Sequence, residues 1–183
     1  MGYRAYVANT SLRRWLDRAQ AEQLAGLLAR YREIRGRLPD DGRIRSALFW
    51  GEYAAQTYYV EIRLTHVVTA LEALLNTDSR LATPQFALRL PRLAEELGFG
   101  VSRTFTNEIY GARSKTAHGR RTPLGAATRQ ARQLARAEEI LRAALRKAIE
   151  DDSFRTACET PEGVGARWGA LPPPQPCGGG ASS

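Results

Sequence analysis

Arg113 and His118 are the two residues of this chain whose chemistry is most informative. They lie in the segment Tyr110-Gly-Ala-Arg-Ser-Lys-Thr-Ala-His-Gly119, with four residues between them. An imidazole exchanges protons near neutral pH, and a guanidinium binds phosphate oxygens through its planar fork. The pair therefore predicts acid–base chemistry on a phosphodiester, with His118 as the general acid or base. The alternative is that His118 only closes a helix, because Gly119 suits a left-handed helix terminator.

The residues around this pair add positive charge and a hydroxyl group. Lys115, Arg120 and Arg121 are basic, and Ser114 can hydrogen-bond a phosphate, so we expect these four to contact RNA. Arginine supplies 25 of the 27 basic residues, however. At that frequency, an Arg four to six residues before at least one of the two histidines arises by chance roughly half the time. The short motif therefore needs support from a wider pattern.

The composition is that of a globular protein with a basic surface. The 183 residues are 43% hydrophobic, which is enough for one domain with a sizeable core. No apolar run approaches the roughly 20 residues that span a bilayer, and no signal peptide is recognisable. We therefore expect a cytoplasmic protein without a membrane partner. The net charge of +8 favours an anionic partner, with RNA as the first candidate; the alternative is that a G+C-rich genome has raised the arginine content.

The two cysteines predict neither a disulfide framework nor a metal site. Cys158 and Cys177 lie near or within the C-terminal tail, and neither has partners at metal-ligand spacing. We expect free thiols in a mobile tail, no metal ion and no cofactor.

Apolar residues recur at helical spacing along most of the chain, which predicts an all-α fold. A break is expected at Gly51 or at 57–60, a kink or division at Pro91, and N-caps at Thr10 and at Thr83 before Pro84. The expected helices cover residues 10–36, 43–76, 83–98, 102–115 and 126–152.

Three regions follow from this pattern. Residues 1–39 hold an N-terminal helix that packs on a bundle, and residues 40–155 form the bundle itself. Residues 156–183 are rich in Pro, Gly and Ser, which predicts a disordered tail.

A second segment strengthens the interpretation of the Arg–His pair. This segment ends some 35 residues before the start of the first motif and lies in an expected core helix; it reads Leu64-Thr-His-Val-Val-Thr-Ala-Leu-Glu-Ala-Leu-Leu75. Together, the two segments resemble the HEPN superfamily, and specifically the Apea-like HEPN domains. In that family an Ala-Leu-Glu-Ala-Leu type helix precedes a Tyr-x-x-Arg-Ser-Lys-x-x-His-Gly segment and a closing helix. The resemblance covers the region 40–155 and matches the order and spacing of both segments.

The resemblance implies a bundle of four to five helices that forms a homodimer. It also implies a metal-independent endoribonuclease that acts in prokaryotic phage defence or a stress response, with Arg113 and His118 at a cleft between two protomers. The reaction would be attack of the ribose 2′-OH on the adjacent phosphate. Many toxic members have Asn, Asp or His after the motif Arg, whereas Ser114 follows the Apea-like pattern. The alternative is a non-catalytic RNA-binding or dimerisation module; an inhibitor or sensor protein is a further implied partner.

Other residues are expected to support this site or to lie apart from it. Glu72 flanks the apolar stripe of its helix, where it can pair with Arg113, and Tyr110 is the second expected supporting residue. His66 falls nearly opposite the stripe, as a surface or interface histidine. Two further groups have open alternatives. For the tyrosines we favour core packing over base stacking; these are Tyr53, Tyr58 and Tyr59. For the arginines we favour a solvated face over RNA contact; these are Arg129, Arg132 and Arg136.

Overall fold

The fold is built from α-helices joined by short connections. The computed structural model describes residues 18–119 and 124–170. No strand occurs in these residues, so the expected all-α class is confirmed. None of the helices in these ranges is long and apolar enough to cross a membrane. The helices are α1 (Arg18–Arg35), α2 (Arg43–Gln56), α3 (Val60–Leu75), α4 (Ala82–Glu96), α5 (Arg103–Ala117), α6 (Ala127–Glu150), α7 (Asp152–Glu159) and α8 (Pro161–Trp168), with short 3-10 turns at Ser79–Leu81 and Leu124–Ala126.

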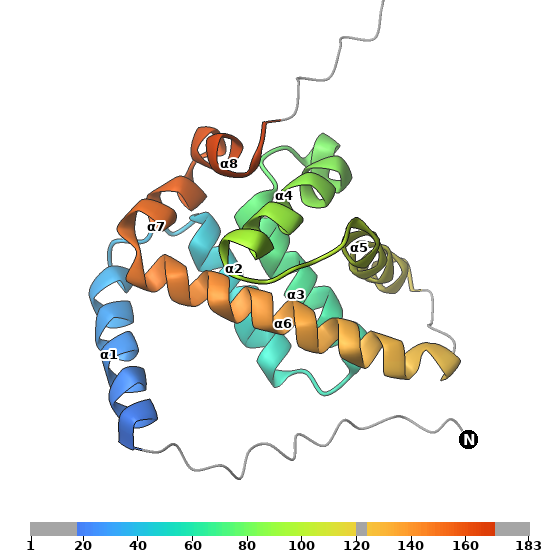
Figure 1. The fold of residues 1–183 in the computed structure, drawn as a ribbon, viewed down its shortest axis with the longest axis horizontal. Coiled ribbons are helices and arrows are strands. Elements are labelled where there is room, and N and C mark those ends of the chain that lie inside the picture. Colours follow the sequence, from blue (N-terminus) through green and yellow to red (C-terminus); the bar gives the residue numbers. More distant parts are fainter. Residues whose placement is uncertain (1–17, 120–123, 171–183) are drawn as a thin grey trace, which may run out of the picture.

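Helix α3 lies at the centre of the molecule, with α6 crossing it along the long axis (Figure 1). It packs against α2, α4, α5, α6 and α7. The interior of the protein therefore forms around one apolar helix, as its broad stripe predicted. Seven of its sixteen residues are buried: Leu64, Val67, Val68, Ala70, Leu71, Leu74 and Leu75.

Helices α2 and α3 are separated at Thr57–Tyr59, which is one of the two expected break points. The backbone of Thr57 and Tyr59 is extended, and the Thr57 hydroxyl donates to the Tyr53 carbonyl over 2.7 Å. Gly51 stays inside α2, where a Cβ atom would lie 3.6 Å from Leu145 Cδ1 of α6. The small residue thus serves the close approach of α6.

The start of α4 differs from the sequence expectation, and of the two expected effects of Pro91, a kink or a division, the division is excluded. The helix begins at Ala82 after an N-cap at Leu81, so Thr83 and Pro84 occupy its first turn. Proline is tolerated there because the first N–H groups of a helix have no intrahelical acceptor. Pro91 lies inside the helix, which continues to Glu96, so the expected division into two helices does not occur.

Helix α1 covers the described part of the expected helix 10–36, and Thr10 lies outside the described residues. Ile34 is buried, whereas Leu24 and Leu28 are exposed. The buried face of α1 is therefore narrower than its apolar periodicity predicted, because α1 packs mainly on one neighbour, α6.

Residues 156–170 are helical and packed, and the prediction of a disordered tail from residue 156 is wrong for them. Phe154 and Cys158 of α7 and Val164 and Trp168 of α8 recur with i,i+4 spacing and are all buried. The Thr160 hydroxyl accepts from the Gly163 N–H, in an N-cap followed by proline. The rest of the predicted tail lies outside the described residues.

Burial also changes the interpretation of Cys158. Its thiol lies in the core, and desolvation raises its pKa to about 12. A raised pKa keeps the thiol protonated, and the protonated form is a poor nucleophile. Cys158 is therefore a core residue and not a reactive thiol in a mobile tail. Cys177 lies outside the described residues.

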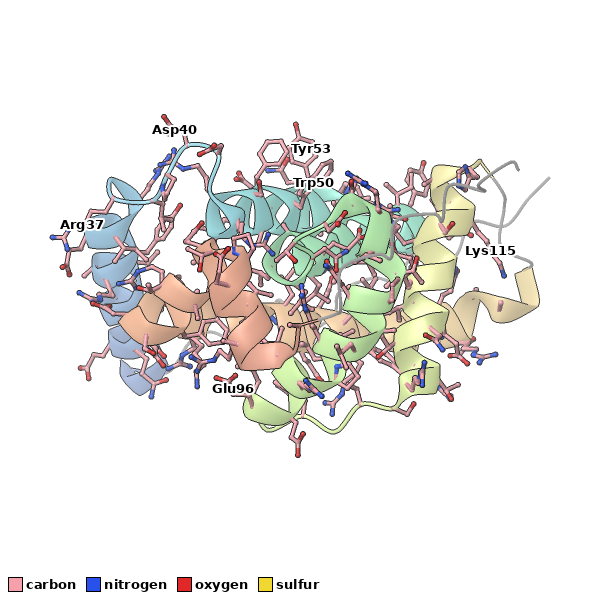
Figure 2. All side chains as sticks on the ribbon, turned by 90° about the horizontal axis from the view of Figure 1, so that it is seen from above. Arg37, Asp40, Trp50, Tyr53, Glu96 and Lys115 are labelled. Atoms are coloured by element: carbon pink, nitrogen blue, oxygen red, sulfur yellow. The ribbon has the colours of Figure 1, made fainter. Side chains whose placement is uncertain are left out.

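The carboxylate of Glu96 joins α4 to α6 and α8. It accepts from both Nε and Nη2 of Arg167 and from the Trp168 indole N–H over 3.0 Å, while Lys147 Nζ lies 3.3 Å away. Glu96 is labelled beside these helices in Figure 2. Arg167 also lies over the Phe154 ring, 5.1 Å from its centroid.

A second guanidinium links the same elements. Arg89 of α4 is buried and donates to the carbonyl of Leu75 at the end of α3 and to that of Gly169, the latter over 2.9 Å. Arg92 adds a bond to the Trp168 carbonyl over 3.1 Å. Residues 168–169 are therefore fixed to α4 by several polar contacts.

We expect Trp168→Ala to lower the free energy of unfolding by about 3–5 kcal/mol, because it removes a fully buried aromatic side chain from the core. Urea denaturation followed by circular dichroism measures this change. Glu162→Gln, at an exposed position of the same helix, is the control and should stay within about 0.5 kcal/mol of the parent. Equal midpoints for the Trp168→Ala variant and the parent would show that α8 does not belong to the cooperative core.

Candidate functional site

Helix α5 carries the Arg–His segment and is fixed at both ends. At its start, the Ser102 hydroxyl accepts from the Phe105 N–H over 3.0 Å. In its middle, Ile109 is buried against α3 and α4. At its end, the His118 N–H bonds the Ser114 carbonyl over 3.1 Å, and Gly119 has a φ of 70°. Gly119 is thus the predicted left-handed terminator, and His118 occupies the C-cap.

Arg113 pairs with Glu72 of the central helix. Arg113 Nη2 lies 3.1 Å from Glu72 Oε2, so the expected contact is present. The approach is that of an ion pair without hydrogen-bond alignment, since Glu72 Oε2 has no hydrogen-bond partner within the described residues. The Glu72 side chain is 12% exposed and that of Arg113 is 32% exposed. The guanidinium is therefore anchored on the core while part of it faces solvent.

Tyr110 lies against this ion pair and connects it to α4. The Arg113 guanidinium carbon is 5.9 Å from the centroid of the Tyr110 ring, and the ring packs against Phe86 at 5.1 Å. Glu72 and Thr83 lie close enough to the Tyr110 hydroxyl to affect its pKa. Tyr110 is accordingly in the supporting position expected from the sequence, within reach of both Glu72 and Arg113.

Burial raises the pKa of the Glu72 carboxyl above its usual value. Arg113, through its charge, and Tyr110, through a hydrogen bond, oppose this effect without cancelling it. Burial likewise raises the pKa of the Tyr110 hydroxyl. The carboxylate is therefore held in a costly charged state, and Arg113 is the partner that reduces this cost.

Arg113 and His118 occupy different sides of α5. Five helical positions correspond to a rotation of about 140° around the axis of α5. The guanidinium turns towards α3, where it contacts Glu72 and Tyr110, whereas His118 is exposed at the end of the helix.

The other expected RNA contacts are distributed over the same end of α5. Lys115 is exposed and points away from the bundle (Figure 2). Ser114 is half-buried and faces α4, where it lines a pocket. Arg120 and Arg121 lie outside the described residues. Ser114 and Lys115 thus lie on different sides of the helix, as neighbouring positions must.

A pocket of about 320 Å³ lies between α4 and α5. Sequence reasoning placed Tyr110 and Ser114 near a site but missed the other lining residues, because the pocket depends on the distance between two helices. The one local signal was Gly111, a glycine in the middle of a predicted helix, which costs about 0.5–1 kcal/mol of helix stability relative to alanine. The lining residues are Thr83, Phe86, Ala87, Thr106, Asn107, Tyr110, Gly111 and Ser114.

The aromatic residues of α2 form a cluster on the surface. Phe49 and Trp50 stack with Tyr53, with ring centroids 4.7 Å and 6.1 Å from its ring. Trp50 and Tyr53 are labelled on the outer side of α2 in Figure 2. His66 of α3 lies 5.5 Å from Trp50, and its Nδ1 is 3.3 Å from the Thr57 hydroxyl, which agrees with the expected surface position.

The expected core packing of the three tyrosines is therefore wrong: Tyr53, Tyr58 and Tyr59 are 48%, 84% and 44% exposed. For Tyr53, the physical reason is that the neighbouring inward positions of α2 are small: Ala47 and Ala54 are buried, and Gly51 faces Leu145. Tyr58 and Tyr59 lie in the connection between α2 and α3, outside both helices.

The arginines of α6 behave largely as a solvated face. Arg129 pairs with Glu108, and Arg136 bonds Glu139 over 3.0 Å. Arg132 is exposed. Two of the three arginines are thus already paired with carboxylates, which reduces the positive charge that they can offer to a phosphate backbone. Within residues 18–119 and 124–170, no three His, Cys, Asp or Glu side chains are grouped as metal ligands.

Comparison of the chain with known proteins identified no relative. None of the family models, curated proteins and solved structures compared with the chain is significantly similar to it. The resemblance to Apea-like HEPN domains therefore rests on the two motifs alone, and the function must be argued from the residues of this chain.

The raised pKa of Glu72 predicts a pH-dependent penalty on stability. A carboxyl whose pKa is higher in the folded state stabilises the fold below its unfolded pKa, and this contribution is lost as pH rises through the folded pKa. We therefore expect the parent to lose stability relative to Glu72→Gln between pH 4 and pH 7. Urea denaturation of both proteins at each pH measures the difference. A difference that stays constant or changes with the opposite sign would contradict the assignment.

Proposed function

We propose that this protein is a metal-independent endoribonuclease of the HEPN type, with Arg113 and His118 as its catalytic residues. The observation that carries the proposal is the anchoring of Arg113 by Glu72 of the central helix. An arginine that only served solubility would need no partly buried carboxylate at its side. An anchored, partly exposed guanidinium is instead suited to hold a phosphate in a fixed position.

The chemistry follows from the two side chains. The imidazole of His118 takes the proton of the ribose 2′-OH, and the 2′-oxygen attacks the adjacent phosphorus. The bond from phosphorus to the 5′-oxygen breaks, and that oxygen receives a proton. The products are a 2′,3′-cyclic phosphate and a 5′-hydroxyl. Arg113 stabilises the charge that develops on the non-bridging oxygens.

The divergence of Arg113 and His118 favours a centre assembled from two chains. In a homodimer, the exposed His118 of one chain can approach the Arg113 of the other, although the two groups of one chain lie about 140° apart around α5. Such a centre is incomplete in the monomer. Assembly would then control cleavage, which suits an enzyme of phage defence or stress response whose activity an inhibitor or sensor protein must restrain.

We expect His118→Ala and Arg113→Ala each to slow RNA cleavage by about 100-fold or more, because they remove proton transfer and charge stabilisation respectively. The assay uses labelled single-stranded and structured RNA in EDTA, with product ends analysed for the cyclic phosphate. Arg32→Ala is the matched control, since Arg32 is an exposed arginine of α1 and lies outside both the Arg–His segment and the aromatic cluster. Circular dichroism verifies that each variant is folded.

Two outcomes would overturn the proposal. One is cleavage by His118→Ala and Arg113→Ala at the parental rate. The other is salt-sensitive RNA binding without cleavage by a folded dimer, which would assign the chain to the non-catalytic alternative.

The exposed aromatic cluster of α2 favours a second candidate function, a dimerisation module. Phe49, Tyr53 and Tyr58 are each at least 48% exposed, and the rings of Phe49 and Tyr53 are in contact. A contiguous aromatic surface of this kind marks an interaction site in soluble proteins. A second copy of the chain is the occupant that the HEPN resemblance implies.

Tyr53→Arg should weaken a dimer formed through this surface by about 10-fold or more, because it places a charge among stacked rings. Sedimentation equilibrium measures the dissociation constant. Leu24→Arg is the matched control, since Leu24 is similarly exposed on α1. Dissociation by Leu24→Arg alone, or a parent that is monomeric at all concentrations, would rule out this interface.

A further inference from the structure

The pocket between α4 and α5 lies directly beside the proposed cleavage residues. Tyr110 connects the pocket with Arg113. It lines the pocket, and the guanidinium of Arg113 is 5.9 Å from the centroid of its ring. The volume of about 320 Å³ is at the lower end of the range for small-molecule sites, roughly 300–1,000 Å³. The space thus suits one flat group and not a large ligand.

The lining is aromatic and polar but carries no formal charge among its described residues. Phe86 is fully buried and packs on Tyr110 with an interplanar angle of 42°. Around these rings lie the amide of Asn107 and the hydroxyls of Thr83 and Ser114. Aromatic faces stack on heterocycles, and amide and hydroxyl groups read their hydrogen-bonding edges. An uncharged heterocycle matches this lining better than a phosphate does.

The charge required for a phosphate lies at the edge of the pocket. Arg113 is not a lining residue, yet it is next to Tyr110 and partly exposed. An uncharged cavity with a guanidinium at its margin is complementary to a nucleotide. In a nucleotide, a neutral base is attached through ribose to an anionic phosphate. A phosphate held by Arg113 would leave the attached base within reach of the pocket.

Gly111 contributes to the width of the pocket. It lies in the middle of α5, its φ is not positive, and a Cβ atom at this position would meet no atom within 4 Å. Positions 107, 111 and 114 share one face of α5 and all line the pocket, so the absence of a side chain at position 111 leaves room there.

We infer that this pocket binds a nucleobase next to the scissile phosphate, and that Asn107 and Ser114 determine which base is preferred. This inference rests on the proposed ribonuclease function, since the base belongs to the same RNA. Tyr110 supplies the stacking surface, the buried Phe86 ring supports Tyr110 from inside the core, and Gly111 leaves room along the pocket.

The test measures binding of the four nucleoside 3′-monophosphates by NMR, with the amide signals of Thr106 and Ser114, two lining residues that no variant changes, as reporters. We expect at least one nucleotide to shift these signals and to bind at least 10-fold more weakly to Gly111→Leu. Gly26→Leu is the matched control, because Gly26 is also a helical glycine whose Cβ would meet no atom within 4 Å. Asn107→Ala, at an exposed position, is a second variant and should change the order of preference among the bases.

The inference is overturned if none of the four nucleotides shifts these signals. It is also overturned if both pocket variants bind the nucleotides with the dissociation constants of the parent. Its failure differs from failure of the nuclease. The parent, Gly111→Leu and Asn107→Ala could all cleave a mixed-sequence RNA with the same base preference. That result would disprove the base pocket and leave the ribonuclease proposal standing. If instead Gly111→Leu weakens nucleotide binding but the parent cleaves no RNA, the base pocket stands and the ribonuclease proposal is disproved.

Discussion

The carboxylate of Glu72 on the central helix is the constraint on which the site depends. Helix α3 is in contact with five other helices, so a charged group on it can lie only at the margin of the core. Burial already raises the pKa of Glu72, and an unpaired buried charge would destabilise the fold. Helix α5 supplies the matching charge through Arg113 and adds Tyr110. The orientation of the proposed catalytic arginine is thus a consequence of how the core accommodates one acid.

Local signals in the sequence were sufficient for much of this arrangement. Glycine after His118 predicted where α5 ends, and the cluster of Thr and Tyr after residue 56 predicted the break between α2 and α3. The pairing of Glu72 with Arg113 was also within reach, because helical angles place Glu72 beside the apolar stripe. These features depend on backbone preferences or on positions within one helix, and both can be read without knowledge of the neighbours.

The features that sequence reasoning missed all depend on which helix faces which. Tyr53 was expected in the core, but Ala47 and Gly51 allow α6 to approach the other side of α2. Residues 156–170 were expected to be disordered, although Phe154 and Trp168 form a buried edge-to-face pair 5.5 Å apart. The pocket requires a particular distance between α4 and α5, which no periodicity encodes. Short helices and aromatic residues beside a Pro- and Gly-rich segment are therefore easily misjudged.

The contacts of Arg89 have a consequence for how the pocket wall behaves. This guanidinium fixes α4 to the end of α3 and to Gly169, and the wall formed by Thr83 and Phe86 belongs to the same helix. The conformational entropy of that wall is therefore lost when the protein folds, and not when a ligand enters. A ligand would meet a preorganised surface on this side, so its intrinsic affinity need not be reduced by the ordering of α4.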